Sequence, residues 1–454
     1  MIEALSEIFS SDRVKLDADS LAHWGRDWTR SFAVAPSAVV FPESVDEVVA
    51  LVRWANASGT ALVPSGGRTG LSGGAVAGNG EVVVSFDRMN KILAFDAADR
   101  IAYCQAGIVT EALQTFAAEH GLAYPVDFAS AGSSQIGGNI ATNAGGIKVI
   151  RYGLTRDWVA GLTVVTGTGE VLRLNHALVK NATGYDLRHL FIGSEGTLGL
   201  VVEAQMRLAP APLPQSVMVL GVPRLRDLLS VMALFQQSMT LSAFEFFSEL
   251  ALEKVTAHRK LTRPLSQPNA FYALIEFDSD AMELASEAFS ACLESGWVTD
   301  GVISQSQAQA RDLWQLREGI SESIAPFTPY KNDVAVRIGD VPDFLEAVDA
   351  VVRSEYPDFE VCWYGHIGDG NLHLNILKPA HLDGASFYER CHQISPKIFE
   401  IVARHQGSIS AEHGVGLLKR DFLSYTRSPE EIAAMRSVKR IFDPNGIMNP
   451  GKLL

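Results

Sequence analysis

The stretch SAGSSQIGGNIATNAGG, residues 130–146, is dense in glycine, and two similar stretches, PSGGRTGLSGGAVAGNG (64–80) and IGSEGTLGLV (192–201), lie in the same part of the chain. Glycine costs conformational entropy, so a loop rich in it usually lets another group approach the backbone closely. Successive backbone N–H groups in such turns form anion-binding nests, which suit the pyrophosphate of a dinucleotide. The three stretches together predict a dinucleotide-binding domain rather than irregular loops.

Two familiar nucleotide motifs do not account for these glycines. The sequence contains no G-x-G-x-x-G, which disfavours an NAD or FAD site of the Rossmann type. Gly446 to Lys452 approach the Walker pattern, but Leu453 stands where a Ser or Thr would bind magnesium. We therefore set aside a Rossmann NAD site and an ATP site.

Composition bounds the class of protein. At 454 residues, with 47% hydrophobic and 20% charged residues, the chain is expected to form two or three globular domains. Its net charge of −14 disfavours nucleic acid and anionic membranes as partners. The four cysteines form no C-x-x-C and favour a reducing compartment. Without a recognisable leader or an apolar run of about 20 residues, we expect a cytoplasmic protein that is not an integral membrane protein.

The expected pattern of helices and strands changes along the chain. From about 36 to 205, short β-rich runs alternate with helical ones such as VDEVVALVRWANASG (45–59). After the proline-rich segment LAPAPLPQ (208–215), longer helices alternate with strands in an α+β pattern. The segment SPEEIAAMRSVKRIF (428–442) predicts a helix with a serine N-cap.

A candidate metal site is suggested by GHIGDGNLHLN, residues 365–375. Asp369-Gly370 predicts a two-residue hairpin turn, which would make His366 face His373. Facing side chains have Cβ atoms about 4.5–5.5 Å apart, close enough for two imidazoles to bind one metal ion. Strand alternation places Asn375 on the same face as His373. For this pair alone, solvated surface histidines remain the simpler interpretation.

A second segment, SAEHGVG (410–416), strengthens the metal hypothesis. It places Glu412 beside His413 between small residues. Two imidazoles and one carboxylate form an open ligand set that leaves positions for a substrate. The spacing in sequence leaves open whether these residues meet.

Six segments taken together resemble the FAD-linked oxidases of the vanillyl-alcohol oxidase type, and within them the D-2-hydroxy-acid dehydrogenases that act on D-2-hydroxyglutarate or D-lactate. The resemblance runs from about residue 27 to the last residue. It implies an α+β fold: a two-subdomain FAD-binding domain (1–208), an antiparallel-sheet substrate and metal-binding domain (209–425), and a C-terminal segment returning to the flavin (426–454). The segments are PSGGRTGLSGGAV (64–76), PVDFASAGSSQIGGNIATNAGGIKVIRYG (125–153), GYDLRHLFIGSEGTLGLV (184–201), GHIGDGNLHLN (365–375), SAEHGVGLLKR (410–420) and IFDPNGIMNPGKLL (441–454).

The resemblance also implies the residues that contact FAD. Because no histidine occurs in the first two glycine loops, we expect the FAD to be non-covalent. Arg68 stands where relatives often have Asn, with little effect expected since backbone forms the nest. The implied FAD-contacting residues are Gly66, Gly67, Arg68, Thr69, Gly70, Gly132, Ser133, Gly137, Gly138, Asn139, Thr142, Asn143, Gly145, Gly196 and Asn449.

The reaction implied is oxidation of D-2-hydroxyglutarate to 2-oxoglutarate. The implied ligands of a divalent metal, zinc or manganese, are His366, His373 and Glu412, with His413 as the catalytic base. The implied substrate-binding residues are Arg317, Ser321, Lys331 and Asn375. Arg317 and Ser321 are four apart and are expected to share one helix face.

Three alternatives remain open at this point. They are a D-lactate or glycolate dehydrogenase of the same family, an NADPH-using flavin reductase of the cell-wall-precursor type, and a non-catalytic flavin or metal-binding protein. Since the sequence has no NAD fingerprint, haem motif or iron–sulfur cysteines, we expect the electrons to pass to an electron-transfer protein, a quinone or oxygen. We also expect a homodimer.

Overall fold

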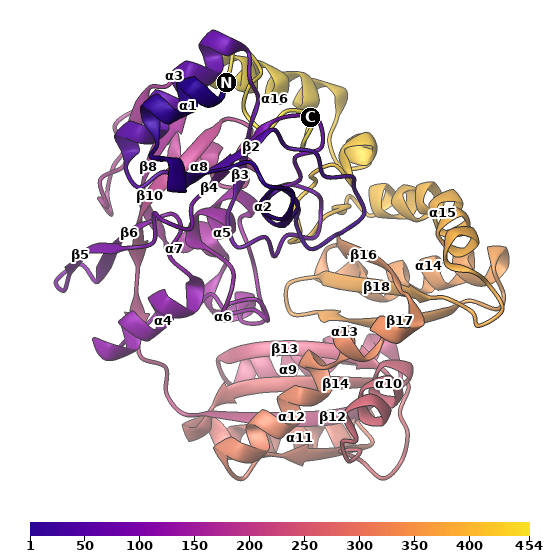
Figure 1. Ribbon diagram of the computed structural model, residues 1–454. Coiled ribbons are helices and arrows are strands. Elements are labelled where there is room, and N and C mark those ends of the chain that lie inside the picture. Colours follow the sequence, from indigo (N-terminus) through magenta and orange to yellow (C-terminus); the bar gives the residue numbers. More distant parts are fainter. The chain divides into compact units, whose positions relative to one another are not determined.

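A computed structural model describes all residues from 1 to 454. The chain folds into two compact units, each with its own sheets (Figure 1). Unit 1 comprises residues 1–146, 153–211 and 412–454, and unit 2 comprises residues 147–152 and 212–411. No helix combines the length and the apolar character that crossing a bilayer requires.

The first sheet of unit 1 is formed by short strands, and its two central strands, β2 and β4, are fully buried. Its order is β1-β2-β4-β3, in which β2, β4 and β3 are parallel and β1 is antiparallel to β2. Helix α3 (Val45–Ser58) begins at the Ser44 cap, ends at Gly59 and packs its apolar face on the sheet. Helix-covered parallel strands are typically continuous apolar runs, as here. The strands are β1 (Val14–Lys15), β2 (Ala38–Val40), β3 (Leu62–Ser65) and β4 (Val82–Ser85), and the other helices are α1 (Ile2–Ile8) and α2 (Ala18–Trp24).

The second sheet of unit 1 is antiparallel throughout. Its order is β5-β6-β10-β8-β9, and its core includes residues of the helices that follow β6. The strands are β5 (Ile92–Asp96), β6 (Ile101–Gln105), β8 (Val159–Thr166), β9 (Val171–Leu174) and β10 (Gly199–Arg207). The accompanying elements are α4 (Thr110–Glu119), α5 (Ile136–Thr142), α7 (Thr155–Trp158), α8 (Arg188–Phe191) and a small ladder of β7 (Leu122–Ala123) with β11 (Ala209–Pro210).

The C-terminal segment returns to the first sheet. Helix α16 (Pro429–Phe442) starts at Ser428, which forms the predicted N-cap within a capping box. After the helix, Asp443 accepts hydrogen bonds from two following backbone N–H groups, both at 3.0 Å. The segment then runs beside β3, where the Asn449 N–H donates to the Leu62 oxygen at 2.8 Å. This pairing fixes where Asn449 lies in unit 1.

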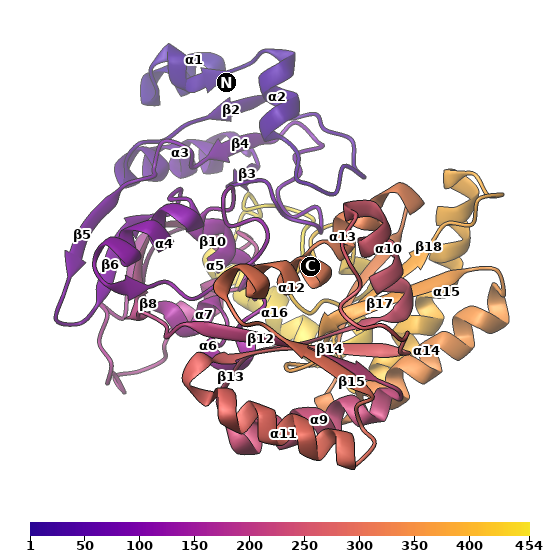
Figure 2. The same cartoon turned by 90° about the horizontal axis from the view of Figure 1, so that it is seen from below.

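Unit 2 is built on one seven-stranded antiparallel sheet of order β15-β12-β14-β13-β17-β18-β16. Figure 2 shows α9 and α11 together on one side of it, while α10, α12 and α13 contribute to the core on the other. The strands are β12 (Gln215–Val222), β13 (Leu241–Ser248), β14 (Phe271–Asp278), β15 (Asp300–Ile303), β16 (Tyr330–Ala335), β17 (Glu360–His366) and β18 (Asn371–Leu377). The helices are α6 (Val149–Tyr152), α9 (Leu225–Ser238), α10 (Glu249–Arg259), α11 (Met282–Glu294), α12 (Gln307–Glu318), α13 (Ile320–Ser323), α14 (Val341–Glu355) and α15 (Gly384–Arg404).

The β17–β18 hairpin forms where predicted, but with a different register. Its loop has four residues, 367–370, so His366 pairs with Asn371 and His373 pairs with Tyr364. The prediction that the two histidines face each other directly was therefore wrong. Gly370 still decides the turn, since its φ is 82° and a Cβ there would lie 2.1 Å from the Val336 oxygen.

Candidate active site

Two glycine loops of unit 1 lie against each other, with backbone of one facing backbone of the other at Gly67 and the Gln135 side chain beside Gly66. A Cβ on Gly67 would lie 2.1 Å from the Ser133 oxygen, and one on Gly66 would lie 3.9 Å from the Cα of Gly138. The backbone N–H groups of residues 66–70 donate no hydrogen bond within the chain. Unused N–H groups on a glycine-lined backbone are what a pyrophosphate needs.

Two buried side-chain oxygens near these loops also lack partners. They are Oδ1 of Asn449, in a fully buried residue, and Oε1 of Gln135. The other end of each amide is engaged: Asn449 donates to the Gly74 oxygen at 2.8 Å, and Gln135 donates to Asp87 at 2.8 Å. Because buried acceptors without donors are rare, both oxygens fit a polar ligand such as the edge of a flavin or a ribose.

Other predicted cofactor-binding side chains are used inside unit 1, which leaves mainly their backbone for a ligand. Arg68 adopts a left-handed φ of 60° and turns its guanidinium back to the Gly66 oxygen at 2.9 Å. Gly196 also has a positive φ, of 71°, and packs on Pro64. The remaining side chains make hydrogen bonds within unit 1. Asn139 donates to the Thr110 hydroxyl at 2.7 Å, Thr142 donates to the Gly138 oxygen at 3.2 Å, and Asn143 accepts the Arg156 N–H at 3.0 Å.

Glu195 fastens the loop 412–416, which carries the predicted ligand and base, within unit 1. Its carboxylate accepts the Val415 N–H at 2.7 Å and the Gly416 N–H at 2.8 Å. Burial raises the pKa of Glu195, although these two N–H groups act in the opposite direction. Its backbone oxygen accepts a hydrogen bond from Asn449 at 2.7 Å. The loop and the C-terminal segment therefore meet at one buried glutamate.

In unit 2, His366 and His373 lie diagonally on one face of the hairpin, with ring centroids 5.1 Å apart. Diagonal neighbours are within reach of long side chains, so the pair converges despite the changed register. Nδ1 of His366 lies 2.8 Å from Oε1 of Glu245 on β13. A carboxylate at Nδ1 orients the ring and directs the Nε2 lone pair outward, as in many metal sites. The donor set therefore fits a divalent metal.

The chain itself leads from this pair to Glu412. Asp333 lies opposite His373 in the β16–β18 register, and its Oδ2 accepts the Ala411 N–H at 3.1 Å. Glu412 is the next residue, with its Cα about 3.8 Å from that of Ala411. The chain thus enters the Glu412-His413 segment from a residue anchored beside the histidine pair.

Arg317 is buried at the end of α12. Its guanidinium lies 2.8 Å from Oε2 of Glu245, an ion-pair distance, but without hydrogen-bond alignment. Nε of Arg317 has no acceptor at all, and the group lies 4.8 Å over the Tyr364 ring. The prediction that Arg317 and Ser321 share one helix face needs correction, because α12 ends at Glu318 and Ser321 belongs to α13.

Three of the four residues predicted to bind substrate, Arg317, Ser321 and Asn375, interact with Tyr364, and the fourth, Lys331, is joined to Ser321. Burial raises the pKa of Tyr364 to about 12, whereas Arg317, Ser321 and Asn375 act in the opposite direction. Lys331 donates to Ser321 at 3.0 Å and lies opposite Asn375 in the β16–β18 register. At neutral pH Tyr364 is a hydrogen-bond donor rather than a base.

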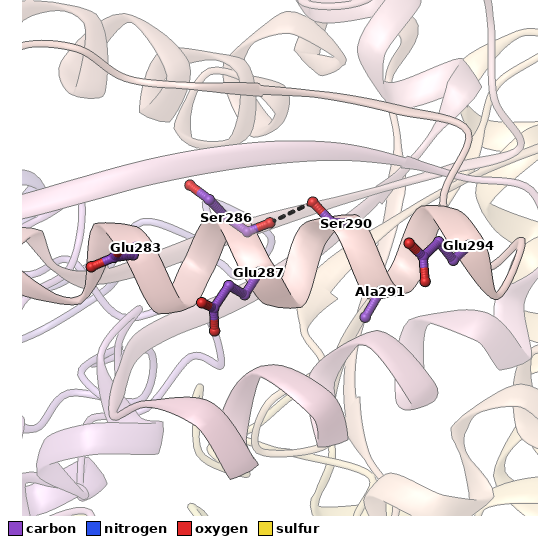
Figure 3. Close-up of a pocket in the computed structure, with 6 residues that line it drawn as sticks. All are labelled: Glu283, Ser286, Glu287, Ser290, Ala291 and Glu294. Carbon is purple, nitrogen blue, oxygen red and sulfur yellow. Dashed lines mark hydrogen bonds between the residues drawn. The ribbon is translucent and has the colours of Figure 1, made fainter.

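A surface pocket on α11 does not compete with this region. Figure 3 shows that all its lining side chains come from one helix and that three of them are glutamates. A cluster of one charge sign repels ligands of that sign, so this face does not suit a carboxylate substrate.

Sequence reasoning missed Glu195, Glu245 and Tyr364. Two of the three had a local signal: Glu195 stands inside the third glycine stretch, and Glu245 is the one charged residue in the strand LSAFEFFS. An acid in an otherwise buried strand requires a partner, which could have marked Glu245. Nothing local marked Tyr364.

Whether the two glycine loops form a cradle for FAD can be tested with Gly67→Ala. The added methyl group would meet the Ser133 backbone at 2.1 Å and force the two loops apart. Overpacking of this kind costs about 1–3 kcal/mol, so we expect the purified variant to retain much less FAD. The control is Gly384→Ala, where a Cβ meets nothing within 4 Å. Equal FAD content in both variants would show that the loops do not form the cradle.

Comparison with known families agrees with this geometry. Residues 36–175 match the FAD binding domain family, and residues 211–453 match the C-terminal domain family of FAD linked oxidases. A D-2-hydroxyglutarate dehydrogenase of Stutzerimonas stutzeri is 59% identical over 100% of this chain and 98% of that protein. Another D-2-hydroxyglutarate dehydrogenase, of Xanthomonas citri pv. viticola, is 55% identical over 100% of this chain and 96% of that protein.

Among solved structures, p-cresol methylhydroxylase with substrate bound has the same fold. Its TM-score is 0.76 at 17% identity, over 100% of this chain and 96% of that one. The predicted fold class, a two-subdomain FAD-binding domain of the vanillyl-alcohol oxidase type with an antiparallel sheet domain, is confirmed.

Proposed function

Because the chain belongs to the family of FAD-linked D-2-hydroxyglutarate dehydrogenases, we propose that it oxidises D-2-hydroxyglutarate to 2-oxoglutarate at the histidine and arginine cluster of unit 2. One observation carries the proposal: Arg317 lies over Tyr364, beside the His366–His373 pair, and a second cation, Lys331, is joined to Ser321, which also interacts with Tyr364. Two cations suit a substrate with two carboxylates.

The roles of the substrate-binding residues follow from their surroundings. Arg317 binds the C1 carboxylate, because it is buried and has an unused Nε donor. Lys331 and Ser321, already joined at 3.0 Å, bind the C5 carboxylate. Asn375, buried on the strand face of His373, orients the hydroxyl or the C1 carboxylate.

The FAD is held non-covalently by the two glycine loops, with Gly145, Gly196 and Asn449 completing the site. FAD bound there would supply the two-electron acceptor for the C2 hydrogen, which would be taken as hydride at N5. The unpartnered oxygens of Asn449 and Gln135 support this placement. The electrons then leave to a separate acceptor, an electron-transfer protein or a quinone.

His413 is the catalytic base that removes the proton of the 2-hydroxyl group. Histidine suits this role because its reference pKa of about 6.5 lets it accept a proton near neutral pH. Glu195 holds the following backbone and so restricts where His413 can lie. A zinc or manganese ion held by His366, His373 and Glu412 would supply Lewis-acid stabilisation of the substrate oxygens.

A substrate panel tests the proposal against D-lactate and glycolate oxidation. We expect kcat/KM with an artificial electron acceptor to be about 10–100-fold higher for D-2-hydroxyglutarate than for D-lactate, since a charged contact to the second carboxylate contributes about 1.5–3 kcal/mol. The L-enantiomer should be inactive. Equal or better use of D-lactate would contradict the assignment of Lys331 and favour the alternative.

The pH dependence of substrate use offers an independent check on Lys331. Desolvation lowers the pKa of Lys331, so it loses its proton at lower pH than an ordinary lysine. We expect kcat/KM for D-2-hydroxyglutarate to fall as pH rises through this lowered pKa. The ratio of kcat/KM for D-2-hydroxyglutarate to kcat/KM for D-lactate should fall over the same pH range. In Lys331→Arg this ratio should stay constant with pH. A ratio independent of alkaline pH in the unchanged protein would remove Lys331 from the C5 site.

A further inference from the structure

We propose that Glu245 is a positioning residue that fixes both the ring tautomer of His366 and the orientation of Arg317. This inference rests on the function proposed above and adds a residue to it. One carboxylate would then align a metal ligand with the group that binds the C1 carboxylate.

Strand pairing brings Glu245 to this place. Strand β13 pairs antiparallel with β17, with Phe246 opposite Gly365. One step further along the same register sets Glu245 beside His366, and their side chains meet at 2.8 Å. The strand alternates so that Glu245 lies on the face that Tyr364 and the histidine pair share. The contact is therefore built into the sheet.

Burying the Glu245 carboxylate destabilises the fold unless other groups pair with its charge. Glu245 is 1% exposed, and it is the one charged residue of a strand made of aromatic, apolar and serine residues. A buried carboxylate without partners is strongly destabilising, and Glu245 has two: His366 at Oε1 and Arg317 at Oε2, each at 2.8 Å.

The two contacts have different chemical consequences. A carboxylate only accepts hydrogen bonds, so Nδ1 of His366 must donate to Oε1, which leaves the lone pair on Nε2 for a metal. Arg317 is held by charge rather than by an aligned hydrogen bond, and its Nε stays without an acceptor. Glu245 thus holds the guanidinium in place without using all its donors.

The test is Glu245→Gln, which keeps the shape and removes the charge. FAD-loaded protein is stripped of metal and titrated with Zn²⁺ alone in competition with a chelator. We expect Zn²⁺ to bind about 10–100-fold more weakly, the usual effect of removing such a partner, with FAD content unchanged. The matched control is Glu276→Gln, a buried glutamate on β14 that pairs with Lys148 at 3.1 Å and with Trp314 at 2.8 Å. It should bind Zn²⁺ as the unchanged protein does.

His366→Ala separates failure of this inference from failure of the metal site. If His366→Ala abolishes Zn²⁺ binding while Glu245→Gln binds normally, the role of Glu245 is overturned and the metal site stands. If His366→Ala also binds normally, the metal site itself is overturned, and the inference with it.

A measurement on the unchanged protein covers the case in which Glu245→Gln does not fold. Two-bond ¹H–¹⁵N spectra of metal-free, FAD-loaded protein report the tautomer of each histidine, and His366→Ala assigns the signal. The Nδ1–H tautomer at His366 supports the inference, and the Nε2–H tautomer overturns it.

Discussion

Replacing His413 with alanine is expected to slow anaerobic flavin reduction by D-2-hydroxyglutarate by about 10²–10⁴-fold, the usual contribution of a general base. FAD and metal content should remain, because His413 is neither a proposed ligand nor part of the glycine cradle. Stopped-flow absorbance of the flavin measures the rate directly.

A second histidine provides the control for this variant. His381 is an exposed residue of unit 2 that pairs with Asp358 at 3.1 Å. His381→Ala should reduce its flavin at the normal rate. Near-normal reduction in His413→Ala would remove His413 as the base.

Replacing Arg317 with methionine should produce two separable effects. The first is on substrate use: loss of a charge-assisted contact to C1 is worth about 1.5–3 kcal/mol, or about 10–100-fold in kcat/KM. The second is on stability, because Glu245 loses one of its two buried partners. We expect the free energy of unfolding to fall by about 3 kcal/mol. This is the low end for a broken buried pair, because His366 still donates to Glu245.

The double variant Arg317→Met with Glu245→Gln separates these effects. Removing both charges should restore most of the free energy of unfolding, as replacing a whole buried pair often does. It should not restore kcat/KM. Arg311→Met, an exposed position on the same helix, is the control for both measurements. Recovery of kcat/KM together with stability would show that Arg317 serves the fold alone.

Local sequence signals predicted several elements of this fold well. The serine cap of α16, the helical pattern of α3 and α16, and the β-rich run of β4 are short-range features, and the structure contains them. The break between α12 and α13 was harder to predict from the sequence. Gly319 stands at the break, and its backbone angles are still helical, so it marks no clear stop.

The hairpin shows why part of the site could not be read from sequence. The Asp-Gly pair at 369 and 370 favours a two-residue turn, but the chain uses four residues and shifts the pairing. A shift of one residue would have moved His373 to the other face. The actual shift keeps both histidines on one face, so their convergence survives a wrong register.

Long-range pairing explains the remaining omissions. Glu245 meets His366 only because β13 lies next to β17, and Tyr364 becomes the centre of the substrate residues only because α12, α13 and β16 meet near it. Neither neighbourhood is encoded within a short window. The glycine stretches, in contrast, each carry their own backbone signature, which is why the sequence alone already suggested a dinucleotide-binding domain.

The most direct test of the proposed activity is anaerobic mixing of the FAD-loaded protein with D-2-hydroxyglutarate, before and after removal of bound metal. We expect the flavin absorbance to be lost with one 2-oxoglutarate formed per FAD, no reduction after chelation, and recovery when Zn²⁺ or Mn²⁺ is returned. Reduction that persists in fully metal-free protein would contradict the role of His366, His373 and Glu412, and reduction by D-lactate but not by D-2-hydroxyglutarate would contradict the proposed substrate.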